Sequence, residues 1–201
     1  KQKTAYEILR CLVGSEMCYK RQITDRTKIV AVTHVGNTTG AITDIAPIIR
    51  RAHEVGAVFV LDACQSVPHL KVDFHALDVD FAAWSAHKMY GPTGVGFLYG
   101  KREMLEALPP ANFGGSMVEL AWMDQEAQYM EPPARFEAGT QPVAQVVAAG
   151  VAAEWLMNIG MEKLEAHERT ITDELLKMGD IDGIRILGPR SNTVSYTHLR
   201  A

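Results

Sequence analysis

Seven polar residues stand at or just after the ends of three short apolar runs: His34, Asn37, Asp62, Gln65, Ser85, His87 and Lys88. The runs cover residues 29–34, 57–62 and 79–84. Open α/β sheets bind ligands at the carboxyl ends of their strands. Each residue taken alone has an ordinary explanation, such as a helix cap, a loop hydrogen bond or a solvated lysine. Polar groups at three adjacent strand ends instead predict one shared ligand site.

Lys88 directly follows Ser-Ala-His, in a loop at the end of a predicted strand. A lysine amine in this place can condense with a carbonyl, while the hydroxyl and imidazole groups beside it hold an anion. Asp62 can pair with a ring nitrogen and keep it protonated, because a nearby negative charge favours the cation. A Schiff-base lysine, a ring carboxylate and a phosphate cup are together what pyridoxal phosphate requires. The residues therefore predict a site for pyridoxal 5'-phosphate.

The three runs are rich in β-branched and aromatic residues and are too apolar for strands with one wet face. We expect strands that are buried on both faces, as in parallel sheets. Between the first two runs, helical spacing from Ile45 to Val55 follows Thr43-Asp44 and ends at Gly56. The order strand, helix, strand predicts an α/β fold whose mostly parallel sheet is flanked by helices.

The chain continues with a strand expected over 95–99 and a short helix over 103–108. Residues 112–140 contain Gly and Pro pairs and predict a long irregular loop near a site or an interface. The stretch 143–157 is rich in Ala and Val and almost uncharged, which predicts a helix buried in a core. The stretch 161–178 alternates in charge and predicts an exposed helix.

A strand predicted over 184–187 begins a new unit. We therefore expect two parts. Residues 1–160 belong to a large ligand-binding domain. Residues 161–201 form a connecting helix and the start of a small C-terminal domain.

Four segments of the sequence resemble the class V aminotransferase family. They are Thr33–Asn37 (THVGN), Asp62–Ser66 (DACQS), Ser85–Gly94 (SAHKMYGPTG) and Arg135–Thr140 (RFEAGT). Within the family, the nearest similarity is to group II cysteine desulfurases of the SufS type, which include selenocysteine lyases. The resemblance covers most of residues 25–189, and the Ser-Ala-His-Lys segment with its Gly-Pro-Thr-Gly turn is its most specific part.

The resemblance implies roles at the ring of the cofactor. Lys88 would form the Schiff base and later move a proton between the substrate Cα and the cofactor. Asp62 would hold the pyridine N–H. Gln65 would bond the phenolic oxygen, and Asn37 would lie beside that same oxygen.

The resemblance also implies a phosphate site. Ser85 and His87 would bind the phosphate, and Thr140 would reach it across a dimer interface. His34 receives no role from the family, and we interpret it as a core or loop histidine bonded to backbone. The sequence departs from the family pattern at Gly36, where Ser is usual, and at Gln141, where Pro is usual.

For the whole protein, the resemblance implies the large domain of a fold type I pyridoxal phosphate enzyme that forms a homodimer. The implied reaction converts L-cysteine to L-alanine and leaves sulfur on the enzyme as a persulfide for iron–sulfur cluster assembly. L-cysteine or L-selenocysteine would be the substrate, and a sulfur-acceptor protein would be a further partner.

Two alternatives stay open. One is another class V reaction, such as that of a selenocysteine lyase, a kynureninase-like enzyme or an aminotransferase. The other is a catalytically inactive piece. The family's cofactor-stacking His, nucleophilic Cys and substrate-binding Arg have no counterparts in the sequence, and residues 1–21 and 193–201 do not follow the family pattern. We therefore expect an internal fragment of a longer chain.

The composition excludes several classes of partner. The 201 residues are 47% apolar, enough for a sizeable core, and the net charge of -4 offers no basic surface for nucleic acid or an anionic membrane. No apolar run reaches the ~20 residues of a membrane-spanning helix, and no signal segment opens the chain, so we expect a cytoplasmic protein. Cys11, Cys18 and Cys64 suit neither a disulfide framework nor a zinc site, and we expect reduced, partly buried thiols.

Overall fold

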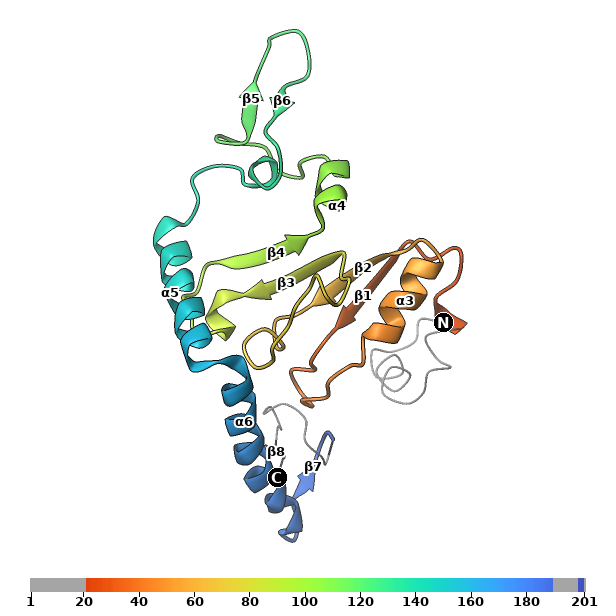
Figure 1. Ribbon diagram of the computed structural model, residues 1–201, viewed down its shortest axis with the longest axis vertical. Helices are drawn as coiled ribbons and strands as arrows, with labels where there is room; N and C mark the ends of the chain where they lie inside the picture. Colours follow the sequence, from red (N-terminus) through yellow and green to blue (C-terminus); the bar gives the residue numbers. More distant parts are fainter. Residues whose placement is uncertain (1–20, 190–198, 201) are drawn as a thin grey trace.

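The computed structural model describes residues 21–189 and 199–200. Its centre is a four-stranded sheet with the order β1-β2-β3-β4 (Figure 1). Strands β1 (Ile29–Thr33), β2 (Val58–Asp62) and β3 (Phe81–Ser85) are parallel, and β4 (Gly96–Gly100) pairs antiparallel with β3. The predicted α/β fold with a mostly parallel sheet is confirmed.

Helix α3 (Ala46–Glu54) forms the crossover between β1 and β2 and buries an apolar face on the sheet. Its N-cap residue is Ile45, which has no side-chain oxygen to cap the helix, and the Thr43 hydroxyl donates to the Thr33 carbonyl at 2.9 Å. At its end, Gly56 has a φ of 70° and the Ala57 N–H bonds the Ala52 carbonyl at 2.9 Å. Helices commonly end at a residue with left-handed backbone, and glycine occupies that position here, as predicted.

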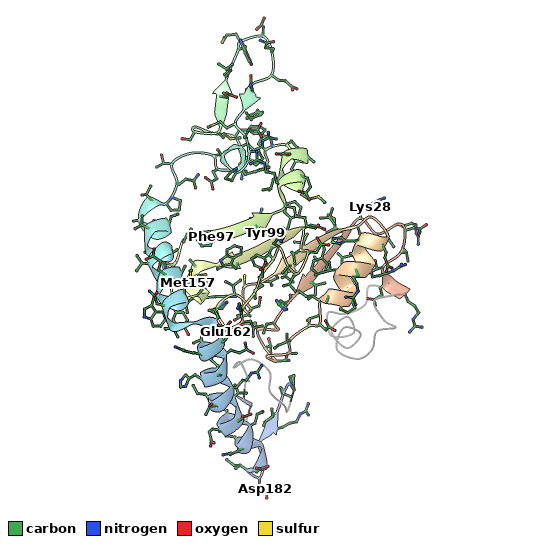
Figure 2. All side chains as sticks on the ribbon, in the orientation of Figure 1. Lys28, Phe97, Tyr99, Met157, Glu162 and Asp182 are labelled. Carbon is green, nitrogen blue, oxygen red and sulfur yellow. The ribbon has the colours of Figure 1, made fainter. Side chains whose placement is uncertain are left out.

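The two faces of the sheet differ in burial. Side chains of one face, including Val32, Phe59 and Leu61, form the core beneath α3. Phe97 and Tyr99 lie on this same face of β4 (Figure 2). The opposite face is open at Ile29, which is 65% exposed, and at Leu98, which is 62% exposed. The prediction of strands buried on both faces is therefore wrong for β1, because the described crossover helix covers only one face.

The segment after β4 is more ordered than predicted. Helix α4 (Arg102–Ala107) follows the sheet, and strands β5 (Val118–Leu120) and β6 (Gln128–Tyr129) form an antiparallel hairpin. The single turn η2 (Ala134–Phe136) follows the hairpin. The prediction of an irregular loop over 112–140 is thus wrong in part, since a hairpin occupies its middle and projects away from the sheet (Figure 1).

Helix α5 (Val143–Ile159) runs past the ends of β3 and β4, and α6 (Met161–Leu176) continues away from the sheet (Figure 1). The turn η3 (Lys177–Asp180) follows, and β7 (Arg185–Ile186) pairs with β8 (Leu199–Arg200). Both predicted helices and a strand inside 184–187 are present. The split into residues 1–160 and 161–201 stays a prediction.

Helix α5 is not the buried helix that its composition predicted. Its buried side chains are Ala149, Ala152 and Leu156. Val147, Trp155 and other large apolar side chains of the helix are more than half exposed. The helix is apolar all round, and only one of its faces packs within the described residues.

Over the described residues, no single helix is long and apolar enough to cross a membrane. Helix α5 and the stretch 161–180 reach that length and composition only as a pair, and the pair is bent by 78°.

Cys64 is a half-buried thiol outside any disulfide, as expected. The other two cysteines, Cys11 and Cys18, lie outside the described residues.

Candidate functional site

The three parallel strands end side by side at one edge of the sheet. Thr33 of β1 is in register with Asp62 of β2, and Asp62 is in register with Ala83 of β3. Parallel strands deliver their following loops to the same edge, so the loops after β1, β2 and β3 meet there. The Asp62 carboxylate is exposed, and its Oδ1 accepts a hydrogen bond from the Cys64 backbone N–H at 3.0 Å.

A pair of amide side chains joins the loops after β1 and β2. Gln65 is 7% exposed, and its Nε2 donates to Oδ1 of the exposed Asn37 at 2.6 Å. Because the bond uses the Asn37 oxygen, the Asn37 side-chain NH2 can still donate elsewhere. The structure therefore brings these two predicted site residues into direct contact.

Lys88 ends a single 3-10 turn, η1 (Ala86–Lys88), that begins directly after Ser85 at the end of β3. Ser85 and Lys88 are half-buried, and His87 is exposed. The Ala86 carbonyl accepts hydrogen bonds from the backbone N–H groups of Met89 and Gly91, both at 2.9 Å, and these bonds close the turn. A Cβ at Gly91 would lie 2.9 Å from the Ala86 oxygen, so this close approach suits only glycine.

The pKa of the Cys64 thiol is influenced by groups at the ends of β2 and β3. Burial raises the pKa of Cys64, and the hydrogen bond and the negative charge of Asp62 raise it further. The Ser85 hydroxyl and the positive charge of Lys88 act in the opposite direction. Groups that act on one sulfur atom lie near it. The structure therefore gathers Asp62, Ser85 and Lys88 around Cys64.

Thr140 lies apart from these groups. It is exposed, in the segment between η2 and α5, and among the described residues no hydrogen bond joins it to the other predicted site residues. A 440 Å³ cavity lies next to it, between the start of β4 and the start of α5, and its lining is mostly apolar. A role for Thr140 across a dimer interface stays a prediction.

His34 differs from its interpretation. It is buried with 9% of its surface exposed, and among the described residues no hydrogen-bond partner reaches its Nδ1. Burial lowers the pKa of His34, which favours the neutral ring. The expected burial of His34 is confirmed, but the expected bond from the ring to backbone is absent at Nδ1.

The sequence did not predict a buried contact between the loop after β2 and helix α6. Nδ1 of His69 lies 2.7 Å from Oε1 of Glu168, and the two side chains are 6% and 12% exposed. Gln65 and His69 belong to one series of hydrogen-bonded turns that starts at Ala63. The two partners are 99 residues apart, so no spacing in the sequence indicates the contact.

A sheet that gathers a lysine, a carboxylate and an amide pair at its carboxyl edge defines an α/β protein suited to a charged aromatic cofactor. The model of the aminotransferase class-V family matches residues 15–199. The chain belongs to this family.

Three relatives illustrate the similarity. The probable cysteine desulfurase 2 of Mycobacterium leprae is 50% identical over 171 residues, which are 85% of this chain and 41% of that protein. The Escherichia coli cysteine desulfurase CsdA (S-sulfonic acid) superimposes with a TM-score of 0.80 at 37% identity, over 86% of this chain and 43% of CsdA. The apo cysteine desulfurase of Thermococcus onnurineus NA1 gives a TM-score of 0.88 at 29% identity, over 95% and 48% of the two chains. This chain therefore spans less than half the length of these relatives.

Pyridoxal phosphate is the cofactor of this family, as the resemblance implied. It needs a carboxylate at its ring nitrogen, donors at its phenolic oxygen, an amine at its aldehyde and donors at its phosphate. Asp62 supplies the carboxylate and the Asn37–Gln65 pair supplies amide donors. Lys88 supplies the amine, and Ser85 and His87 supply the hydroxyl and the imidazole. By the chemistry of this donor set, the residues at the sheet edge fit the cofactor.

Proposed function

We propose that the complete protein is a pyridoxal phosphate-dependent cysteine desulfurase. The observation that carries the proposal is Lys88 in a closed turn directly after β3, at the edge of the sheet where Asp62 ends the neighbouring strand β2. The names of the relatives support the reaction, since each of the three is described as a cysteine desulfurase. The reaction converts L-cysteine to L-alanine.

When bound, pyridoxal phosphate withdraws electrons from the substrate Cα through its protonated ring. Asp62 keeps the proton on the ring nitrogen by its negative charge. Gln65 and Asn37 donate hydrogen bonds at the phenolic oxygen. Lys88 holds the cofactor at rest and then takes the proton from the substrate Cα as a general base.

Ser85 and His87 hold the phosphate end of the cofactor by a hydroxyl and an imidazole donor. They flank Ala86 in the same turn as Lys88, so the phosphate contacts and the lysine belong to one rigid piece of backbone. Holding the phosphate fixes the distance from Lys88 to the reacting carbon, which reduces the entropy lost on reaching the transition state.

Cys64 does not receive the sulfur. Burial and the negative charge of Asp62 raise the pKa of Cys64, which keeps it a thiol at neutral pH, and the thiolate is the reactive form. A different cysteine of the complete protein therefore attacks the substrate sulfur. A sulfur–sulfur bond forms, the substrate carbon–sulfur bond breaks, and L-alanine leaves while the enzyme holds a persulfide.

The proposal extends to the assembly. The complete protein is a cytoplasmic homodimer, and Thr140 of each subunit reaches the phosphate in the other. The exposure of Thr140 supports this role, because an exposed side chain is available to a second subunit. A sulfur-acceptor protein takes the persulfide sulfur for iron–sulfur cluster assembly. The large domain ends at about residue 160, where Gly160 separates α5 from α6.

Borohydride reduction of the complete protein, followed by peptide mapping, tests the lysine. The pyridoxyl group should be found on Lys88, and labelling of another lysine would refute the assignment. Alanine formation from L-cysteine with a reductant tests the reaction, with L-selenocysteine as the competing substrate. Activity on L-selenocysteine alone would identify a selenocysteine lyase instead.

A further inference from the structure

Tyr90 adopts a backbone conformation that its side chain disfavours. Its φ is 63°, and the other described non-glycine residues with positive φ are Asp78 and Ser116. Short polar side chains such as Asp tolerate the left-handed region because they bond to nearby backbone. Tyrosine is not among the residue types that routinely adopt this region. Strained backbone of this kind is retained where surrounding structure holds it.

The strained residue closes the turn that carries Lys88. The Gly91 N–H bonds the Ala86 carbonyl five residues back, and Tyr90 is the left-handed residue between them. The end of α3 has the same closure, where the Ala57 N–H bonds Ala52 around Gly56. This chain therefore uses glycine for the closure at a purely structural position and tyrosine two residues after Lys88.

The ring of Tyr90 contributes little to core burial, since the residue is 55% exposed. Its described ring contact is with Trp155 of α5, where the two ring centroids are 5.4 Å apart with the planes at 61°. Aromatic rings attract each other in this edge-on geometry. Trp155 is itself 51% exposed. The contact thus fastens the Lys88 turn to α5 from outside the core.

We propose that Tyr90 and Trp155 are positioning residues for Lys88. The proposal rests on the proposed function, in which Lys88 holds the cofactor and moves a proton. The contact with Trp155 offsets the strain at Tyr90 and holds the turn in one arrangement. The Lys88 amine is thereby aimed at the sheet edge, beside Asp62 and Ser85. Neither aromatic residue touches the reacting atoms.

Substitution of Tyr90 in the complete holoenzyme tests the proposal. Tyr90→Ala should lower kcat by on the order of tenfold and leave KM for L-cysteine within about twofold, because misplacement of a catalytic group affects the chemical step. The pH midpoint of the cofactor's visible absorbance should shift, and borohydride should label Lys88 less completely. Tyr90→Phe retains the ring that meets Trp155 and should keep a higher kcat than Tyr90→Ala.

Tyr90→Gly separates the ring from the backbone conformation. Glycine adopts the left-handed region without strain but has no ring to meet Trp155. We expect Tyr90→Gly to be impaired like Tyr90→Ala. Wild-type kcat and an unshifted absorbance midpoint in Tyr90→Gly would overturn the proposal.

Variants of α5 test the role of Trp155, and they remain decisive if a Tyr90 variant does not fold. Trp155→Ala should reproduce the effects of Tyr90→Ala, and Trp155→Phe should rescue them. Val151→Ala is the matched control, one helical turn earlier on α5 and 62% exposed. Equal impairment in Val151→Ala would mean general damage to α5 and would overturn the proposal.

The double variant Tyr90→Ala/Trp155→Ala should be no worse than either single variant, because both remove one contact. Fully additive losses would overturn the proposal. Borohydride labelling of the wild-type protein distinguishes a failure of the proposed function from a failure of the positioning role. A pyridoxyl group on another lysine refutes the proposed function, whereas correct labelling of Lys88 with unimpaired variants refutes only the positioning role.

Discussion

The side chain of Asp62 has two roles, one structural and one electrostatic. Its Oδ1 fixes the turn after β2 through the Cys64 N–H, and its charge acts on groups at the sheet edge. Asp62→Asn retains an oxygen for the turn but removes the charge. We therefore expect this variant to bind some cofactor and to lose at least about a hundredfold in turnover, since a neutral amide does not stabilise a ring cation.

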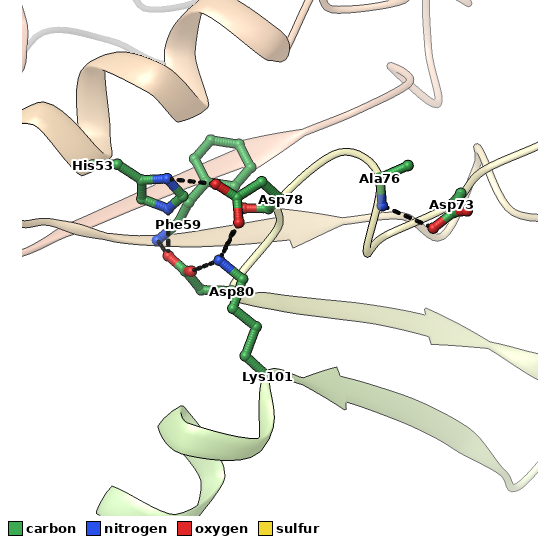
Figure 3. Close-up of polar contacts among 7 residues, drawn as sticks. All are labelled: His53, Phe59, Asp73, Ala76, Asp78, Asp80 and Lys101. Carbon is green, nitrogen blue, oxygen red and sulfur yellow. Dashed lines mark hydrogen bonds and ion pairs between the residues drawn. The ribbon is translucent and has the colours of Figure 1, made fainter.

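Cofactor absorbance and kcat with L-cysteine measure the two effects in the complete protein. Asp73→Asn is the matched control, because Asp73 also accepts a backbone hydrogen bond, from Ala76 at 2.9 Å, but lies outside the site (Figure 3). Wild-type turnover in Asp62→Asn would remove Asp62 from the mechanism.

Cys64 should react slowly with alkylating reagents. Burial and then Asp62 raise the pKa of Cys64, so less thiolate is present at any given pH than for an ordinary cysteine. Alkylation followed by mass spectrometry should show a slow rate at neutral pH that increases as the pH rises. Asp62→Asn should accelerate it, because two of the causes that raise the pKa come from Asp62. An unchanged rate in that variant would contradict the electrostatic link.

At the scale of elements, an ionic cluster fastens the sheet at the edge opposite the site. Asp80, 1% exposed and just before β3, accepts hydrogen bonds from the Phe59 N–H of β2 at 2.8 Å and from the Lys101 Nζ after β4 at 2.7 Å (Figure 3). Nε2 of His53, from α3, lies 2.9 Å from the same carboxylate, and Nδ1 lies 3.2 Å from Asp78. The cluster therefore joins α3, β2, β3 and β4.

Removal of the central carboxylate should destabilise the fold. Asp80→Ala leaves Lys101 and the Phe59 N–H without their buried partner, and the free energy of unfolding should fall by about 3–5 kcal/mol. Urea unfolding of the complete protein measures the change. Glu54→Ala, which breaks the exposed Arg51–Glu54 pair, is the control and should cost less than about 1 kcal/mol. Equal losses in the two variants would show that the cluster adds nothing beyond a surface pair.

The same cluster determines how the stability of the protein changes at acid pH. Burial acts to raise the pKa of Asp80, but Lys101, the Phe59 N–H and His53 outweigh it and lower the pKa below that of an ordinary aspartate. A carboxylate whose pKa is lowered by folding stabilises the protein above its unfolded pKa, and the contribution is lost as pH falls through the folded pKa. Asp80→Asn should therefore weaken the dependence of the urea midpoint on pH in the acid range.

The elements differ in how far the sequence could predict them. Strands β1 to β4, α3 and the Lys88 segment have strong local signals in β-branched runs, a helical repeat and a specific motif. The hairpin β5–β6 has short strands and a register shift, so its alternation is weak. The exposure of α5 was not predictable from its composition, because apolar content indicates that a helix prefers burial and not that a partner is present. The left-handed backbone of Tyr90 has no signal in the sequence, because that conformation is unfavourable for tyrosine.

At the scale of the whole molecule, the described residues expose many large apolar side chains. On α5 alone, Val143, Val147, Val151 and Met157 are each more than 60% exposed. Folding nets only about 5–15 kcal/mol, and each large apolar side chain left in water forgoes about 1.5–3 kcal/mol. We therefore expect these 201 residues, produced alone, to aggregate or melt without cooperativity, to bind the cofactor weakly and to form no alanine from L-cysteine.

Thermal melting, cofactor absorbance and alanine assay of the purified 201-residue chain check this expectation, with the complete protein as reference. A cooperative melt together with measurable alanine formation would contradict it.

Gly160 is the entire connection between α5 and α6, since it caps both helices and has a φ of 90°. One inserted residue there would rotate α6 by about 100° around its axis. Glu168 would turn away from His69, and Glu162 would turn away from Lys71, which it now meets at 2.7 Å. Residues 121–126, at the end of the β5–β6 hairpin, are exposed and admit insertions without moving either pair. Variation in chain length among homologues should therefore concentrate in this hairpin and avoid the junction at Gly160.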